Sequence, residues 1–265
     1  LHDALPIYAK KLDSLFIMAL NIGWSLSKLF VNDDAVDTYE DNELRFESKF
    51  ISELTNLDAI TRWLKGHRAG FRVLHPVRQV NNLYFDTFDY RSYGDNLAGI
   101  SRRIKTRLRW YGDAEGGLPS SALEFKHRVN KQGWKDSYPL NKLALTDDWR
   151  HLIAAISRQL PVDARHTFYS FPMPTLINNY SRAYYLSSDG HLRVTVDKNI
   201  KVFDQRNTTR PKFSPKINLP EYLVVEFKYH HDDFQSVDGI IRDFPLRPSR
   251  SSKYVTGVKA IVEAV

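Results

Sequence analysis

The sequence contains no cysteine among its 265 residues. This absence excludes disulfide bonds, thiolate zinc sites and cysteine nucleophiles, and a chain without thiols fits a reducing compartment. We therefore expect a cytoplasmic protein. A hydrophobic fraction of 42% argues against a disordered chain, and the length suits one large domain or two small ones.

The sequence also lacks an uncharged run long enough to cross a membrane as a helix. The longest such run near the N-terminus, between Asp13 and Lys28, is shorter than the ~18 apolar residues that a spanning helix needs. Its apolar residues recur with helical spacing, which indicates an amphipathic helix packed on the domain. A helix that contacts a partner or a membrane surface, and an extension translated from outside the gene, are the alternatives.

The first residues differ from an ordinary protein start. Residue 1 is not methionine, and residues 1–7 match what a common sequencing adapter encodes when translated, so Met18 is an alternative start. Residues 32–42 are acidic and polar, as in a linker. We expect residues 1–42 to comprise a non-native start, an amphipathic helix and an acidic linker, and residues 43–265 to form the main domain.

Acidic residues are too few to balance the basic ones. The chain has 38 Lys and Arg against 31 Asp and Glu, which gives a formal net charge of +7 and a pI near 9.4. This balance favours a polyanionic partner such as nucleic acid, anionic lipid or a phosphate polymer. Charge alone does not choose among them.

From residue 43 onward the pattern predicts short strands with a few helices. Five segments alternate strictly between apolar and charged residues, as half-buried strands do: 44–49, 103–110, 123–128, 192–197 and 223–228. Two further strands are expected at 79–85 and 178–186, and the turn at 187–190 predicts a hairpin. Helices are expected at 57–66, 147–159, 237–244 and 252–262. Thr146 or Asp147 would cap the second of them.

The charged strand faces point to function. Arg103, Lys105, Arg107 and Arg109 lie on one face of a single strand, with neighbours about 7 Å apart. At an effective dielectric of about 20, each neighbouring pair repels by about 2 kcal/mol before screening. One interpretation is a sheet with its charged side in water. The other, which we favour, is an α+β fold: a closed antiparallel β-barrel with helices packed on its outside and an anion inside.

Eight segments resemble a known family. They are RFESKF (45–50), NNLYFDTFDY (81–90), SRRIKTRLRWYG (101–112), ALEFKHR (122–128), YSRAYY (180–185), HLRVTVD (191–197), LVVEFKY (223–229) and SRSSKY (249–254). In this order they resemble the VTC domain, the catalytic domain of polyphosphate polymerases, which belongs to the triphosphate tunnel metalloenzymes and is related to the CYTH group. The resemblance covers about residues 44–262.

The resemblance implies a polymerase that transfers the terminal phosphate of a nucleoside triphosphate, ATP by expectation, onto a growing polyphosphate chain. The catalytic basic residues of the family match Arg107, Arg109, Lys126 and Lys253. Its substrate-binding positions match Lys49, Arg182, Arg193, Lys228 and Ser252, and Arg103 and Lys105 extend the same basic face. Lys131 and Lys135 are candidates for the exit. The metal-binding glutamate matches Glu226, with Glu124 and Glu47 as further candidates, so the expected cofactor is a divalent metal, Mn²⁺ or Mg²⁺.

Several residues also have structural interpretations. Glu124 and Glu226 would pair with neighbouring lysines across strands, and Asp197 with Arg193. Asp86 is expected to cap or turn the chain. Residues 230–233 have the composition of a metal site, but we expect an exposed loop. The tyrosines expected to pack in the wall are Tyr84, Tyr111, Tyr184 and Tyr185.

Other functions stay open at this point. One is a regulatory domain that binds polyphosphate or inositol phosphates without catalysis. Another is an inorganic triphosphatase or a nucleotide cyclase, which Arg45 disfavours because hydrolytic CYTH members carry a glutamate there, in the motif ExExK. A nucleic-acid binder would need an exposed basic surface with aromatic platforms. We therefore expect a nucleoside triphosphate and polyphosphate as partners, and no nucleic acid.

Overall fold

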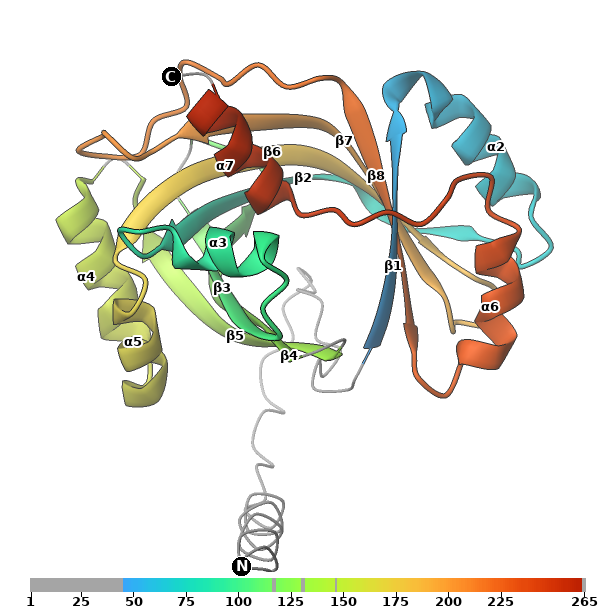
Figure 1. Ribbon diagram of the computed structural model, residues 1–265, viewed down its shortest axis with the longest axis horizontal. Coiled ribbons are helices and arrows are strands. Elements are labelled where there is room, and N and C mark those ends of the chain that lie inside the picture. Colours follow the sequence, from blue (N-terminus) through green and yellow to red (C-terminus); the bar gives the residue numbers. More distant parts are fainter. Residues whose placement is uncertain (1–44, 116–117, 130–131, 146, 264–265) are drawn as a thin grey trace, which may run out of the picture. The chain divides into compact units, whose positions relative to one another are not determined.

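The computed structural model describes residues 45–263, apart from 116–117, 130–131 and 146 (Figure 1). All of these residues belong to one compact unit, Glu40–Val265. The predicted start, helix and linker of residues 1–42 lie outside the described residues, as does Lys131. In the described part, no helix is both long enough and apolar enough to cross a membrane.

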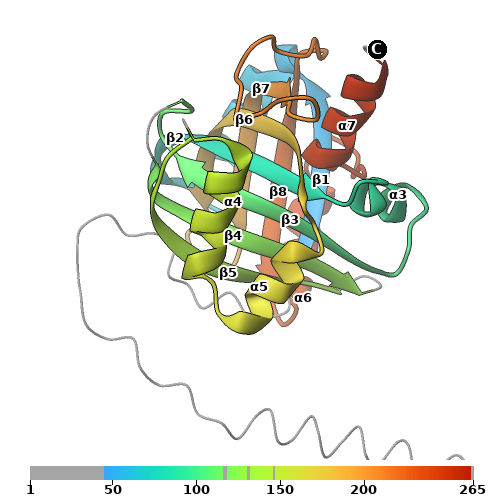
Figure 2. The same cartoon turned by 90° about the vertical axis from the view of Figure 1, so that its left-hand side faces the viewer.

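The described strands form one eight-stranded antiparallel sheet in the order β1-β8-β7-β6-β2-β3-β4-β5. The strands are β1 (Arg45–Glu53), β2 (Arg72–Asp86), β3 (Arg102–Tyr111), β4 (Leu118–Val129), β5 (Gln132–Leu143), β6 (Met173–Leu186), β7 (Arg193–Asp204) and β8 (Tyr222–His230). Figures 1 and 2 show that the sheet is strongly curved, and its two edge strands, β1 and β5, approach each other. The predicted hairpin between residues 178–186 and 192–197 is confirmed as β6 and β7.

The sheet is not closed by hydrogen bonds. Among the described residues no backbone ladder joins β1 to β5. An ion pair connects β1 to β4, the neighbour of β5: Lys126 Nζ of β4 lies 3.3 Å from Glu47 Oε2 of β1. The antiparallel sheet is therefore confirmed, whereas a hydrogen-bonded closed barrel is not.

Two hydrophobic clusters cover the convex face of the sheet. The first joins α4 (Trp149–Gln159) and α5 (Val162–Tyr169) to strands β2 to β5. The second joins α2 (Leu57–Gly66) and α6 (Phe234–Arg242) to β1, β7 and β8. Because side chains alternate across a strand, burying the apolar residues here turns the charged residues to the concave face. We call this concave face the charged face.

Helix α7 (Lys253–Glu263) packs on the charged face, next to α3 (Arg91–Leu97). Its residues Tyr254 and Val258 contact Tyr84, Leu176 and Val202 of the sheet. The expectation that helices lie outside the sheet is correct for α2, α4, α5 and α6 and wrong for α7. The reason is that Leu176 and Val202 interrupt the polar pattern with an apolar patch, which α7 buries.

The predicted helices agree with α2, α4, α6 and α7 to within three residues at each end. Helix α4 begins after Asp148, whose carboxylate accepts a hydrogen bond from the backbone N–H of His151 at 2.9 Å, so the predicted cap at Thr146 or Asp147 is wrong. Strand β5 and helices α3 and α5 were not predicted, and neither was the short 3-10 turn at Leu54–Asn56.

Candidate active site

The charged face brings together all of the predicted site residues. Directly paired residues of neighbouring strands share a face, and the pairs on this one include Lys49 with Glu226, Lys105 with Lys126, and Arg107 with Glu124. The remaining strand residues, Glu47, Arg103, Arg109, Arg182, Arg193 and Lys228, follow from the same registers. Ser252 and Lys253 reach the face from the start of α7.

Glu226, on β8, is surrounded by four cations. Lys49 Nζ lies 3.2 Å from Oε1 and Lys253 Nζ 3.7 Å from the same atom, while Arg182 and Lys228 each lie 3.7 Å from Oε2. Burial alone would raise the pKa of the Glu226 carboxyl, but Lys49, Lys253 and the other cations hold that pKa well below its usual range. Glu226 is therefore ionised, and its pairing with lysines is confirmed.

Asp197, on β7, positions two of the predicted substrate contacts. It is fully buried, and both of its oxygens accept hydrogen bonds from Arg182, at 2.6 and 2.7 Å. Lys253 Nζ lies 2.6 Å from Asp197 Oδ2. The predicted partner, Arg193, is wrong, because it lies four residues away along β7, about 13 Å, and is paired in register with Lys228.

Glu124, on β4, anchors the opposite wall. Arg107 donates to its Oε2 through Nε at 2.7 Å and approaches with Nη2 at 2.6 Å. Lys135 and Arg109 lie 3.4 and 3.9 Å from the same carboxylate. Burial would raise the pKa of Glu124, but Arg107 and Arg109 lower it strongly. Its predicted cross-strand pairing is confirmed, and Lys135 belongs to this wall.

Polar residues absent from the predicted site hold the arginines in place. Arg109 donates to Asn82 Oδ1 at 2.9 Å and to the Tyr180 hydroxyl at 3.4 Å. Arg107 donates to the Tyr84 hydroxyl at 3.3 Å. The signal for Asn82 and Tyr84 was their spacing of two residues within the predicted strand 79–85, which places both on one face.

Asp86 ties α3 to α7. It accepts hydrogen bonds from the backbone N–H groups of Ser92 and Tyr93, at 2.9 and 3.2 Å, so its predicted capping role is confirmed. The Tyr254 hydroxyl of α7 donates to the same carboxylate. Burial and Asp86 both raise the pKa of Tyr254, which keeps this hydroxyl a donor.

Lys105 has no carboxylate partner among the described residues. Its ammonium donates to Ser252 Oγ at 2.9 Å, just before α7 begins. Burial, followed by Lys126 and Lys49, lowers the pKa of Lys105 well below its ordinary value. Burial also lowers the pKa of Lys228, to about 7, although Glu226 opposes the shift. An anion that binds next to these buried lysines would stabilise their charged form.

Two of the three carboxylates expected to bind a metal, Glu226 and Glu47, lie next to each other. Lys49 Nζ bridges Glu226 and Glu47, at 3.2 and 3.0 Å, whereas Glu124 lies in the other cluster. Burial would raise the pKa of Glu47, but Lys126 and Lys49 lower it to about 2, so it is ionised. No group of three or more His, Asp or Glu in the described residues has metal-binding geometry. Glu226, helped by Glu47, would thus hold the ion with phosphate and water oxygens, as is usual for Mg²⁺.

His230 ends β8, and His231, Asp232 and Asp233 form the turn that follows it. His231 and Asp232 are exposed, and Asp233 pairs with His191, whose Nδ1 lies 2.8 Å from Oδ1. The expected exposed loop is confirmed.

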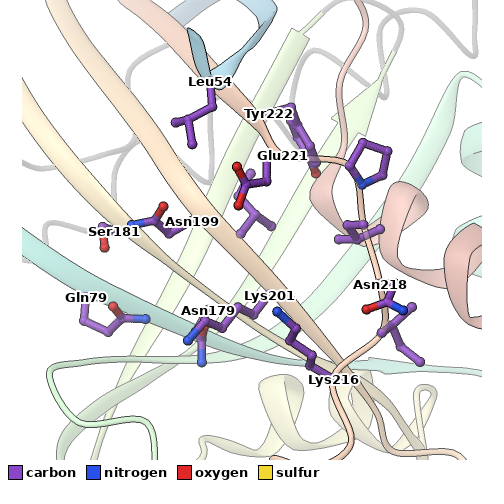
Figure 3. Close-up of a pocket in the computed structure, with 14 residues that line it drawn as sticks. Leu54, Gln79, Asn179, Ser181, Asn199, Lys201, Lys216, Asn218, Glu221 and Tyr222 are labelled. Carbon is purple, nitrogen blue, oxygen red and sulfur yellow. The ribbon is translucent and has the colours of Figure 1, made fainter. Parts of the chain in front are cut away.

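A polar groove of about 450 Å³ is lined by residues of β2, β6 and β7 and by the segment 216–222 (Figure 3). Its lining includes Gln79, Asn179 and Ser181, which alternate with the residues of the charged face. Lys201 and Lys216 add positive charge. None of the predicted site residues lines this groove.

Comparison with known proteins identifies the family. Residues 44–262 match the VTC domain family. No match was found among curated proteins. Among solved structures, a candidate adenylate cyclase from Vibrio parahaemolyticus is 12% identical over 81% of this chain and 97% of its own, with a TM-score of 0.46. The PH1819 protein from Pyrococcus horikoshii is 11% identical over 83% and 99%, with a TM-score of 0.43. The Mediator head module of Schizosaccharomyces pombe is 12% identical over 83% and 95%, with a TM-score of 0.38.

These structural likenesses are too distant to carry an argument about function. The family match, in contrast, spans most of the sequence and includes every predicted site residue. The chain belongs to the VTC domain family.

Proposed function

We propose that this protein is a polyphosphate polymerase that moves the terminal phosphate of a nucleoside triphosphate onto a growing polyphosphate chain. The observation that supports it most is the charge of the charged face. Four carboxylates there (Glu47, Glu124, Asp197, Glu226) meet ten basic residues of the predicted site: Lys49, Arg103, Lys105, Arg107, Arg109, Lys126, Arg182, Arg193, Lys228 and Lys253. A linear polyanion is the ligand that such a surface binds best.

In this proposal the curved sheet acts as a tunnel around the substrate. Arg107, Arg109 and Arg182 are pre-oriented by Glu124, Asn82 and Asp197. Their planar guanidinium groups suit phosphate oxygens, to which they donate two parallel hydrogen bonds. Lys105 of β3 and Lys253, the first residue of α7, would neutralise the terminal phosphate, where the helix N-terminus adds a favourable dipole.

The transfer itself needs alignment and charge neutralisation. A terminal oxygen of the polyphosphate attacks the γ-phosphorus of the nucleotide, and a new P–O bond forms as the bond to the β–γ bridging oxygen breaks. The bridging oxygen keeps the electron pair and leaves with the nucleoside diphosphate. The attacking oxygen is already an anion, so no side chain has to remove a proton. A divalent metal held by Glu226 would supply further charge neutralisation on the phosphate oxygens.

The direct test incubates the full chain with ATP and Mn²⁺ and separates the products on a gel stained for polyphosphate. A ladder is expected, and it should disappear in the Glu226→Gln and Arg107→Ala variants. Arg158→Ala is the matched control, because Arg158 is an exposed cation of α4 on the convex side. Release of phosphate without a ladder would identify a triphosphatase and contradict the proposal.

The second candidate is a regulatory domain that binds polyphosphate without making it. The full pairing of Glu226 with cations favours it, because a carboxylate that balances lysines needs no metal. Tight binding of polyphosphate with no product from ATP would support this function.

A nucleoside triphosphate substrate agrees with the cytoplasmic location expected from the absence of cysteine.

A further inference from the structure

A tyrosine–arginine stack extends the charged face beyond the phosphate-binding residues. Arg78 lies on β2, between Tyr111 on β3 and Tyr184 on β6. Its guanidinium carbon is 5.8 Å from the centroid of each tyrosine ring. The edge of His75 contacts Tyr184, with ring centroids 5.5 Å apart at 81°. Three strands thus contribute one stack of flat groups.

This stack is open on one side. Tyr184 is only 4% exposed, whereas Tyr111, the last residue of β3, is 40% exposed. Arg78 has no carboxylate partner in the part of the chain that the structure describes. Its guanidinium group instead makes cation–π contacts with the two tyrosine rings. The expectation that Tyr111 packs in the wall is therefore wrong, whereas it is confirmed for the buried Tyr184. An exposed aromatic ring backed by a guanidinium group is instead suited to stacking on a flat, π-rich ligand.

The stack is continuous with the phosphate-binding arginines. Arg78 is paired in register with Arg182, and Tyr111 follows Arg109 by two residues on the same face. Burial raises the pKa of Tyr184 to about 12, although Arg182 and Arg109, which lie toward the phosphate-binding residues, lower it. From Tyr111 to Arg107 the strand spans about 13 Å. A nucleotide can therefore place its ring system at Tyr111 and its phosphates at Arg109 and Arg107.

We propose that Arg78, Tyr111 and Tyr184 form the site for the nucleobase of the nucleoside triphosphate. This inference rests on the proposed function, since it needs the triphosphate on the charged face. The exposed Tyr111 ring stacks on the base, and Arg78 and Tyr184 hold that ring in place. Since all nucleobases have a π face, the stack favours nucleotides over inorganic phosphates more than it selects one base.

The test compares ATP with inorganic tripolyphosphate, which carries the same three phosphates without a base. The affinity of the full chain for each is measured by titration calorimetry at constant ionic strength. Tyr111→Leu should weaken ATP binding by roughly five- to hundredfold, the range for the loss of one base–aromatic stack. It should leave tripolyphosphate binding unchanged. Tyr111→Phe keeps the ring and should bind ATP as the original chain does.

Tyr169→Leu is the matched control, because Tyr169 is also an exposed tyrosine but ends α5. Thermal melting verifies that each variant is folded, and Arg78→Met serves as a second variant expected to weaken ATP binding. Equal loss of ATP and tripolyphosphate affinity in Tyr111→Leu would overturn the inference, as would binding of neither ligand to the original chain. If both ligands bind but no polymer is made, the polymerase fails, and the ratio of the two affinities still decides the nucleobase site.

Discussion

At the scale of single residues, the basic side chains of the charged face differ in whether a carboxylate pairs with them. Glu226, Glu124 and Asp197 are each shared by two or more cations, whereas Lys105 contacts the Ser252 hydroxyl and no carboxylate among the described residues. Shared carboxylates keep the arginines ordered before a ligand arrives. Lys105 would therefore gain most from an anion bound to the charged face.

Asp197 should be the most important carboxylate for stability. Asp197→Asn keeps the shape but removes the nearest buried counter-charge of Arg182 and Lys253, and breaking a buried pair typically costs about 3–5 kcal/mol of unfolding free energy. Urea unfolding monitored by circular dichroism measures the loss. Asp238→Asn is the control, because the Arg242 side chain of its ion pair is 77% exposed and such pairs contribute only about 0–1 kcal/mol. Equal losses in the two variants would show that Asp197 is not a structural anchor.

Lys228 should make polyanion binding dependent on pH. Its pKa is lowered to about 7 by burial, and a bound phosphate would raise that pKa, so binding takes up a proton above pH 7. The affinity for tripolyphosphate should then fall as pH rises from about 7, by at most about tenfold per pH unit. Calorimetry between pH 6 and 9 measures the slope.

The Lys228→Arg variant keeps its positive charge throughout this pH range, so its affinity should change less with pH. The titration of tripolyphosphate itself affects both chains equally, and the difference between their slopes therefore reports on Lys228. Lys105, whose pKa is also lowered, would leave a residual slope. Identical slopes in the two chains would exclude Lys228 as the titrating group.

At the scale of elements, α7 is the part whose position decides the site. It contributes Ser252 and Lys253 to the charged face, and its contacts with the sheet are close at Gly257. A Cβ atom on Gly257 would come within 2.8 Å of a methyl group of Leu176 and within 3.4 Å of Val202. Glycine at this position therefore lets the helix approach the strands.

Gly257→Val should push α7 away from the sheet. Overpacking of this kind costs about 1–3 kcal/mol, and the displaced helix should also bind tripolyphosphate more weakly. Gly239→Val in α6 is the control, because no atom lies within 4 Å of the Cβ position there. Thermal melting and calorimetry report the two effects. A Gly257→Val chain with unchanged melting temperature and affinity would contradict the close packing of α7.

The strands were predictable where charge and apolar character alternate, and β5 was not. Gly133 and Pro139 interrupt the pattern of β5, which is tolerated because β5 is an edge strand. Helices α3 and α5 span only seven and eight residues, too short for a clear periodic signal. Alternation could place Asp197 on the charged face, but not its partner Lys253, because that contact depends on how α7 docks.

At the scale of the whole molecule, repulsion among the surplus cations lowers the free energy of unfolding, and a bound polyanion would reduce that repulsion. Polyphosphate at about 100 times its dissociation constant should stabilise the chain by about 2.7 kcal/mol. For a domain of this size that corresponds to a rise of roughly 5–10 °C in melting temperature. Orthophosphate at the same total phosphate concentration should give a much smaller rise, and added salt should reduce both. Equal shifts with the two phosphates would argue against a site built for a linear polyanion.

Among the described residues no backbone ladder holds the edge strands β1 and β5 together, so the width of the sheet is not fixed by hydrogen bonds. A ring of strands joined by backbone ladders has a fixed circumference, whereas here an ion pair runs from Glu47 of β1 to Lys126 of β4, the neighbour of the other edge strand. The Lys126 side chain is 44% exposed, and a partly exposed pair of this kind opens at a cost of about 1 kcal/mol or less. Opening of this pair would let the sheet widen, and under the proposed function that freedom would accommodate a hydrated, counterion-coated polyphosphate chain.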